Sequence, residues 1–320
     1  MIEYDKHRWT EHLLDIEGSM LREIIGRVSV CVAWSAVVVV YHHLVRSLAV
    51  SATTHTLVGV ALGLLLVFRT NASYDRFWEG RKRWGALVNE ARNLGRGVRA
   101  YIKGDPHLVD AILHWTTAFA YASKDSLRGK VGIGPVAGRL PDPDVKAVLE
   151  AEHVPLAVAL RISELLAEAR NRGLISDYVL MMLDRNVQSF IDDLGACERI
   201  LKTPLPFVYV VHLRRALILY CFTLPLAIVG FYGWWTIPVM LLASYMFFGI
   251  EEIGVEIEDP FGRDENDLPL ERICETIEKN LQSLAVAEVS DRPESSPPRS
   301  SGDHRASEES PAGTVRSLPW

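Results

Sequence analysis

Residues 57–84, LVGVALGLLLVFRTNASYDRFWEGRKRW, place an apolar run directly before a basic run that contains several aromatic side chains. A basic and aromatic segment of this kind is compatible with a nucleic-acid surface, a membrane stop signal, or the throat of an ion pathway. The apolar residues that precede it, and similar blocks elsewhere in the chain, discriminate among the three.

The composition argues against a nucleic-acid-binding protein. The chain has 320 residues, a formal net charge of -6 and 49% hydrophobic residues. A negative net charge gives no electrostatic footprint for nucleic acid. Because 23% of the residues are charged as well, the apolar residues must be gathered into blocks.

Four apolar blocks have the length of membrane-spanning helices. They are residues 28–45, 48–68, 216–232 and 234–250. Each is close to the roughly 20 residues that a helix needs to cross the hydrocarbon layer. The alternative, buried helices of a soluble protein, is disfavoured because no block carries the polar face typical of surface helices. The blocks therefore predict four transmembrane helices in two hairpins.

Lysine and arginine counts predict the orientation of these helices. Residues 1–27 hold four such residues and residues 69–103 hold nine, whereas the connection after the first block holds only Arg46 and the turn 231–236 holds none. Since basic loops stay on the cytoplasmic side, both termini and the middle of the chain should be cytoplasmic. We expect an integral protein of the bacterial inner (cell) membrane.

The region between the hairpins shows the periodicity of packed helices. Its apolar residues recur at steps of three, four and seven, as at Phe77, Trp84, Leu87, Ala91, Leu94 and Val98. The C-terminal residues are instead rich in Ser, Pro, Glu and Arg, a composition typical of disorder. The predicted segments are a cytoplasmic N-terminal segment (1–27), a first hairpin (28–68), a helical cytoplasmic domain (69–206), a second hairpin (207–250), a cytoplasmic helical segment (251–287) and a disordered tail (288–320).

No sequence motif indicates catalysis. The chain lacks GxSxG and HExxH motifs, and its four cysteines show no CxxC spacing that would suggest zinc or a disulfide framework. The four apolar blocks contain no Asp or Glu, which disfavours a proton-coupled transporter. We therefore expect no enzymatic activity.

The second apolar block carries a pattern of its own. On a helical wheel one narrow sector collects Thr53, Thr56, Leu57, Val60, Leu64 and Phe68. Gly59 and Gly63 fall on the adjacent flank, where small residues let a neighbouring helix approach closely. The apolar row is then available to lipid, to another helix or to the axis of an oligomer. Around an axis, Val60, Leu64 and Phe68 would form successive apolar rings that gate by dewetting.

The basic stretch after Phe68 has the pattern of a packed helix. Asp75, Glu79 and Arg83 stand at four-residue steps, a spacing that allows ion pairs within one helix. Phe77 and Trp84 belong to the apolar stripe of the cytoplasmic region. This arrangement favours a helix that leaves the membrane over an open surface on which bases stack.

Several segments together resemble one known family. They are FRTNASYDRFWEGRKRWGALVNEARNLGR (68–96), LMMLDRNVQSFIDDLGACERILKTPLPF (180–207), GIEEIGVEIEDPFG (249–262) and GSMLR (18–22). In this order they resemble the prokaryotic branch of the bestrophin family, also called the RFP-TM chloride channel family, over roughly residues 1–285. The resemblance implies an all-α homopentameric ion channel whose partners are its own copies, the bilayer and small inorganic ions.

The resemblance also implies roles for individual residues. The bestrophin pore neck corresponds to Val60, Leu64 and Phe68, the row that the helical wheel had already isolated. A second, cytoplasmic aperture corresponds to Leu205, between the prolines of the TPLP sequence. The family default is conduction of chloride and other anions. The alternatives are conduction of monovalent cations such as sodium, as in some prokaryotic relatives, and a non-conducting membrane scaffold.

The sequence leaves two questions open: the sign of the conducted ions and the binding of calcium. His212, Arg214 and Arg215 precede the third apolar block and either favour anions or anchor to lipid headgroups. Animal bestrophins bind calcium through consecutive aspartates after the D-P-F-G motif. Here the matching positions Asp259, Asp264 and Asp267 are interrupted by Arg263 and Asn266. We therefore expect no cofactor, with a solvated acidic loop as the alternative to a calcium site.

Overall fold

The computed structural model describes residues 20–45 and 51–285, and every regular element in those ranges is a helix. The N-terminal residues 1–19, Arg46 and the predicted tail lie outside the described residues. The elements are α2 (Leu21–Leu44), α3 (Ala52–Tyr101), α4 (Pro106–Leu127), η1 (Pro135–Arg139), α5 (Asp142–Leu149), α6 (Val154–Asn171), α7 (Asp177–Lys202), α8 (Phe207–Tyr232), η2 (Gly233–Trp235), α9 (Thr236–Glu256) and α10 (Leu270–Ala285). The all-helical fold predicted from the sequence is confirmed.

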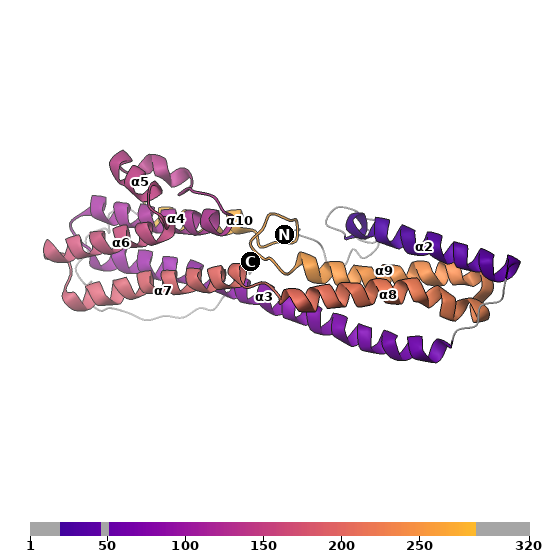
Figure 1. Cartoon of the computed structure of the whole chain (residues 1–320). Coiled ribbons are helices and arrows are strands. Elements are labelled where there is room, and N and C mark those ends of the chain that lie inside the picture. Colours follow the sequence, from indigo (N-terminus) through magenta and orange to yellow (C-terminus); the bar gives the residue numbers. More distant parts are fainter. Residues whose placement is uncertain (1–19, 46–50, 286–320) are drawn as a thin grey trace, which may run out of the picture. The chain divides into compact units, whose positions relative to one another are not determined.

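Helix α3 is the longest element and takes part in both of the helix groups described below. It runs for 50 residues, and its sequence contains no proline that would interrupt it. Its first part packs on α8 and α9, and its last part packs on α7, α10 and α4 (Figure 1). The predicted ion pair on this helix is confirmed, since Arg83 Nε lies 2.7 Å from Glu79 Oε1. The helix therefore passes from apolar to charged surroundings without a break.

The first helix group consists of α2, the beginning of α3, α8 and α9. Its core is formed by the buried apolar residues Ile24, Val28, Cys31, Leu62, Leu66, Leu213, Leu217, Tyr220, Cys221, Leu224, Met240 and Phe248. Three helical stretches in the described residues are long and apolar enough to cross a membrane: Leu21–Leu44, Ala52–Tyr101 and Phe207–Glu256. The third folds back on itself at η2, where Gly233 has a φ of 52°, so it contributes the two helices α8 and α9.

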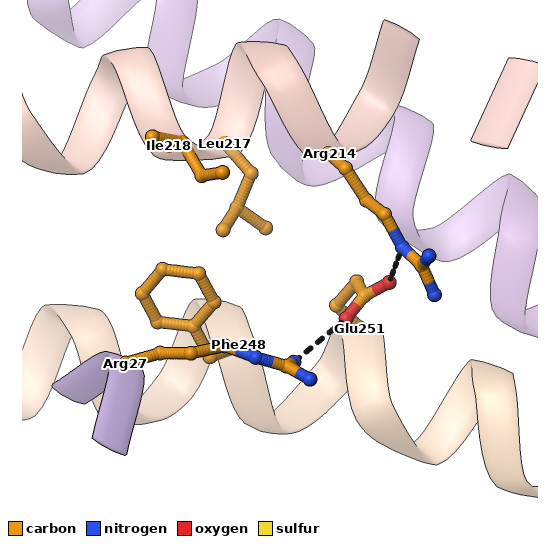
Figure 2. Close-up of a pocket in the computed structure, with 6 residues that line it drawn as sticks. All are labelled: Arg27, Arg214, Leu217, Ile218, Phe248 and Glu251. Atoms are coloured by element: carbon orange, nitrogen blue, oxygen red, sulfur yellow. Dashed lines mark hydrogen bonds and ion pairs between the residues drawn. The ribbon is translucent and has the colours of Figure 1, made fainter. Parts of the chain in front are cut away.

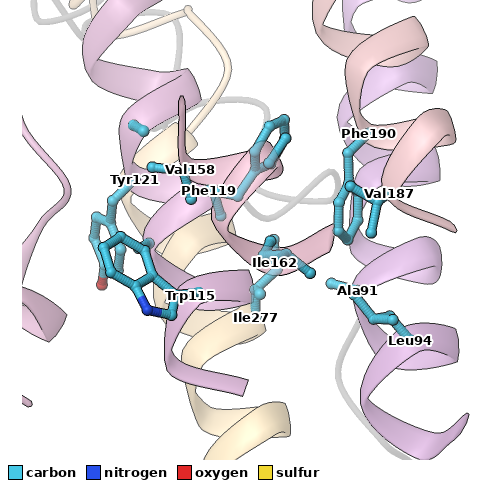
Figure 3. Close-up of a cluster of buried hydrophobic side chains, with 14 of the residues drawn as sticks. Ala91, Leu94, Trp115, Phe119, Tyr121, Val158, Ile162, Val187, Phe190 and Ile277 are labelled. Atoms are coloured by element: carbon cyan, nitrogen blue, oxygen red, sulfur yellow. The ribbon is translucent and has the colours of Figure 1, made fainter. Parts of the chain in front are cut away.

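The second helix group packs the rest of α3 against α4, α6, α7 and α10. Its core is a large buried cluster that includes Trp84, Trp115, Phe119, Ile162, Phe190 and Ile277 (Figure 3). The rings of Phe119 and Phe190 stack with their centroids 5.0 Å apart, which joins α4 to α7. The periodic apolar positions predicted a packed helical domain here, and Trp84, Leu87, Ala91, Leu94 and Val98 are all buried.

One of the two glycines of the second apolar block mediates a close helix contact. A Cβ on Gly59 would lie 2.6 Å from the hydroxyl of Tyr220 on α8, so only glycine allows this approach. A Cβ on Gly63 would meet nothing within 4 Å. The expected close packing is therefore seen at Gly59, whereas no described residue of the same chain comes this close to Gly63.

The segment boundaries predicted from the sequence mark changes in composition, and most of them do not coincide with the ends of helices. The boundaries after residues 27, 68 and 250 fall inside α2, α3 and α9, whereas the boundary after residue 206 coincides with the N-cap of α8 at Pro206. The backbone hydrogen bonds of a helix continue unchanged where its side chains change from apolar to polar. A helix can therefore cross the boundary between two environments, as α3 does.

Candidate functional site

The apolar row singled out from the sequence lies on an uncovered face of α3. Val60, Leu64 and Phe68 are 61%, 55% and 65% exposed in the single chain. The opposite face of the same turns is packed, with Leu62 and Leu66 fully buried. The row is thus a continuous apolar surface that residues 20–45 and 51–285 do not cover, available to lipid, another subunit or a pore axis.

A buried cluster of charges begins at the residue after Phe68. Arg69 on α3 is only 1% exposed, and its Nη1 lies 2.5 Å from Oε1 of Glu251 on α9, which is also buried. Arg214 of α8 donates from Nε to the same oxygen at 2.9 Å. Arg27 of α2 donates to the other carboxylate oxygen at 3.4 Å, as Figure 2 shows for Arg27 and Arg214.

The cluster ties four helices together at the polar end of the first helix group. Each of α2, α3 and α8 contributes one arginine, and α9 contributes the carboxylate that all three share. Hydrogen bonds between guanidinium and carboxylate are stronger than neutral ones. A buried charge without its partner is costly, so the four helix ends are constrained to stay together.

A second set of contacts positions the predicted cytoplasmic aperture. The backbone N–H of Leu205 donates to Glu258 Oε1 at 3.0 Å. Arg76 on α3 donates from Nη2 to the carbonyl of Ile200 at 2.6 Å and from Nε to the carbonyl of Glu258 at 3.1 Å. The segment 203–206 between α7 and α8 is thereby held against α3 and the end of α9, with Leu205 half-buried.

The segment 251–258 connects the two predicted constrictions. Glu251 binds Arg69, the neighbour of Phe68, and Glu258 binds the backbone of Leu205. Arg69 Nη2 also lies 3.9 Å from Glu258 Oε2. Neither constriction is therefore free to move without straining contacts to the same stretch of α9 and the residues that follow it.

The acidic loop after this segment does not have the arrangement of a metal site. Asp267 Oδ2 accepts the backbone N–H of Asp264 at 2.7 Å, and Asp259 Oδ1 accepts that of Phe261 at 3.1 Å. Nowhere in residues 20–45 and 51–285 do three or more His, Cys, Asp or Glu side chains group as metal ligands. Calcium needs six to eight oxygen ligands, whereas here Asp259 and Asp267 each turn one oxygen to a backbone N–H of the loop and Asp264 contributes its own backbone N–H.

Burial gives one of these aspartates an unusual affinity for protons. Asp267 is buried, and loss of solvation, reinforced by the charges of Asp264 and Asp259, raises its pKa to about 6.

Comparison with known proteins identifies the family. The chain matches the family described as Bacterial/Fungal Bestrophin protein over residues 1–283. It belongs to the bestrophin family. The resemblance inferred from the sequence motifs is therefore confirmed.

The bestrophin relatives include named channel proteins. A voltage-dependent anion channel-forming protein of Synechocystis sp. is 41% identical over 280 residues, covering 86% of this chain and 91% of the relative. The voltage-dependent anion channel-forming protein YneE of Escherichia coli (strain K12) is 33% identical over 288 residues, covering 89% and 94%. The family is one of channels and not of enzymes, as expected from the absence of catalytic motifs.

A solved bestrophin structure has the same fold. The crystal structure of a bacterial bestrophin homologue from Klebsiella pneumoniae superposes with a TM-score of 0.77 at 32% sequence identity, covering 82% of this chain and 98% of that chain. At this level of identity the likeness extends beyond the fold to membership of the same family.

Sequence reasoning missed the buried cluster around Glu251. Glu251 lies one residue beyond the last apolar block, so it was not counted as an intramembrane acid, and α9 in fact continues to Glu256. The signal was present in the sequence, since Arg27 and Arg69 directly flank the first and second apolar blocks, Arg214 lies two residues before the third, and Glu251 directly follows the fourth. Four charged residues at the same depth in the membrane are expected to pair with one another, because an unpaired charge there is energetically costly.

The substitution Glu251→Gln should destabilise the protein strongly, because it leaves the buried Arg69 with only the more distant carboxylate of Glu258, 3.9 Å from its Nη2. We expect a loss of about 3 kcal/mol or more, measured as lowered thermal stability of the purified protein in detergent. Glu252→Gln is the matched control, since Glu252 pairs with the half-exposed Arg27 and its loss should cost less than about 1 kcal/mol. Equal shifts for the two variants would contradict the assigned role of Glu251.

The substitution Asp267→Asn should stabilise the protein above about pH 6. The folded-state pKa of about 6 lies above the ordinary aspartate pKa of 3.8 that applies in the unfolded chain, so wild-type stability falls as the pH rises from about 4 through 6 and stays lower above it. Asparagine keeps an acceptor for the Asp264 N–H but cannot ionise, so we expect a gain of about 1–3 kcal/mol at pH 8 and none near pH 4. Melting temperatures against pH, in calcium-free buffer, test this. A variant that is less stable than wild type at pH 8 would show that the ionised carboxylate is favourable.

Proposed function

We propose that the chain assembles as a homopentamer and forms a passive anion channel in the bacterial inner membrane, with both termini and the helical domain in the cytoplasm. The observation that carries this proposal is the uncovered apolar row of Val60, Leu64 and Phe68 in a bestrophin-family chain. An apolar face of this length needs a partner, and copies of α3 around an axis supply one.

The spacing of the row suits a narrow hydrophobic neck. Four residues along a helix rise about 6 Å, so three rings at this spacing form a constriction of about 12 Å. Such a constriction contains no group that could replace the water around an ion, and it conducts only when it is wide enough to stay wet. Small changes in the position of Phe68 then switch the current, and Arg69 fixes that position through Glu251.

The proposed aperture at Leu205 is a second place where the pathway narrows. Its backbone is fixed by Glu258, and Arg76 Nη1 donates to the carbonyl of Thr203 in the same loop. A side chain on a loop that is held at several points is suited to a constant restriction. The aperture would therefore filter ions, and the apolar neck would gate them by dewetting.

The names of the relatives support anions as the conducted ions. Both the Synechocystis and the Escherichia coli proteins are called voltage-dependent anion channel-forming proteins. Apolar rings do not choose the sign of charge, so the choice depends on charges that flank them. His212, Arg214 and Arg215 are exposed near the beginning of α8 and provide positive charge on the proposed cytoplasmic side.

One observation supports cation conduction as the second candidate. Asp75 is exposed on α3 and lies seven residues, or about two turns, after Phe68. It therefore continues the face that carries the proposed neck. In a pentamer, five such carboxylates below the neck would attract cations.

Purified protein in planar bilayers with asymmetric KCl should give a reversal potential near the equilibrium potential of chloride. The expected sign follows from the positive residues at the proposed cytoplasmic mouth. A reversal potential near that of potassium would overturn the anion assignment, and Asp75→Asn should then shift it back toward zero. Absence of current from protein whose native mass corresponds to five subunits would favour the scaffold alternative.

Trimming the proposed neck should raise the current, whereas trimming another face of α3 should not. We expect Leu64→Ala and Val60→Ala to raise single-channel conductance or open probability roughly twofold or more, because a wider apolar constriction stays wet. Val58→Ala is the matched control, since Val58 is also exposed but lies on a different side of the helix. Equal effects of Val60→Ala and Val58→Ala would contradict the placement of the pore.

A further inference from the structure

A cavity opens between α2, α8 and α9 beside the buried charge cluster. It has a volume of about 270 Å³. Its lining residues are Arg27, Arg214, Leu217, Ile218, Phe248 and Glu251 (Figure 2). The known contacts of the cluster do not use this space, and neither the neck nor the aperture includes it.

The cavity has an apolar part and a cationic part. Leu217 and Phe248 are buried and form an apolar wall, and Ile218 is exposed beside them. Arg27 and Arg214 lie toward the other side, with Glu251 between them, as Figure 2 shows. A ligand that satisfies both parts must be amphiphilic, with an anionic group next to an apolar chain.

The two arginines retain donors for such an anion. Arg214 contacts Glu251 through Nε, and Arg27 contacts Glu251 and Glu252 through Nη1. The side chains are 51% and 44% exposed, so the remaining N–H groups are accessible. The lining holds two arginines and one glutamate; although Arg27 is also paired with Glu252, Glu251 is shared with the buried Arg69, so Arg214 keeps most of its positive charge.

We propose that this cavity binds an anionic phospholipid of the cytoplasmic leaflet, with the phosphate at Arg27 and Arg214 and an acyl chain along Leu217, Ile218 and Phe248. Guanidinium groups recognise phosphate through paired, charge-assisted hydrogen bonds. The position fits, because the apolar sequence of α9 ends at Ile250, one residue before Glu251. Basic pockets between membrane helices on the cytoplasmic side are suited to lipid headgroups.

The apolar wall distinguishes this ligand from a free anion. Inorganic phosphate would contact only the arginines and leave Phe248 and Ile218 unused. The proposal rests on the membrane orientation given under the proposed function, but lipid binding is measured without any ion current. A failure to bind lipid and a failure to conduct are therefore distinguishable.

The test is native mass spectrometry of the full-length protein in detergent, titrated with phosphatidylglycerol. We expect retained phosphatidylglycerol, and roughly tenfold weaker retention in Arg214→Gln because charge-assisted contacts to phosphate are lost. Arg215→Gln is the matched control, since Arg215 is the exposed neighbour that does not line the cavity. Phosphatidylcholine should bind more weakly than phosphatidylglycerol. Equal retention in Arg214→Gln and Arg215→Gln, or of the two lipids, would overturn the proposal.

A second pair of variants tests the seat of the acyl chain. Ile218→Trp should fill the cavity and reduce phosphatidylglycerol retention severalfold, whereas Leu219→Trp, on an exposed neighbour outside the lining, should not. Competition by millimolar inorganic phosphate as strong as that by lipid would show a small-anion site instead. A changed subunit number in Arg214→Gln or Ile218→Trp would show that the cavity is covered by another subunit, and would also overturn the lipid assignment.

Discussion

The shared carboxylate of Glu251 is the constraint on which the arrangement of the apolar helices depends. Apolar side chains in a bilayer gain little from contacting one another, since lipid tails are equally apolar. The positions of the helices relative to one another must therefore be set by polar contacts. Arg27, Arg69 and Arg214 reach Glu251 from α2, α3 and α8, so one side chain on α9 sets the depth of three neighbouring helices. Hydrophobic packing fills the space between them but does not fix their register.

This constraint extends to the proposed ion pathway because Arg69 follows Phe68 directly. The side chains of adjacent residues point about 100° apart on a helix, so burying Arg69 against α9 turns Phe68 toward the uncovered face. The buried Arg69, and not the hydrophobicity of the row, thus sets the rotation of α3 about its own axis. The apolar row is therefore left on the uncovered face and not in the core. Glu258 then carries the constraint to Leu205 through a backbone hydrogen bond.

The sequence predicted those features that depend on periodicity and composition. The helical class, the apolar helices, the Glu79–Arg83 pair and the exposed row on α3 follow from spacing along one helix, which needs no knowledge of its neighbours. Features that depend on two helices were predicted less well. Gly63 was expected to allow the close approach of another helix, and no described residue of the same chain makes one. Glu251 was missed because its partners lie 37, 182 and 224 residues away in the sequence. The aspartates at 259, 264 and 267 match a family pattern, yet Asp259 and Asp267 turn an oxygen to a backbone N–H group, which no residue spacing reveals.

The charge cluster also bears on selectivity, because most of its positive charge is already compensated. Arg69 is buried against Glu251 and Arg27 contacts Glu252 at 2.7 Å, so neither presents a full charge to a passing ion. Arg214 shares a carboxylate that Arg69 holds more closely, and Arg215 has an exposed side chain nearby. The positive charges of Arg214 and Arg215 thus counteract the negative charge of Asp75, the single exposed acidic residue on this face of α3. Selection between anions and cations in such a pore is a balance of a few partly screened charges, and single substitutions among them can reverse it while the neck and the fold stay the same.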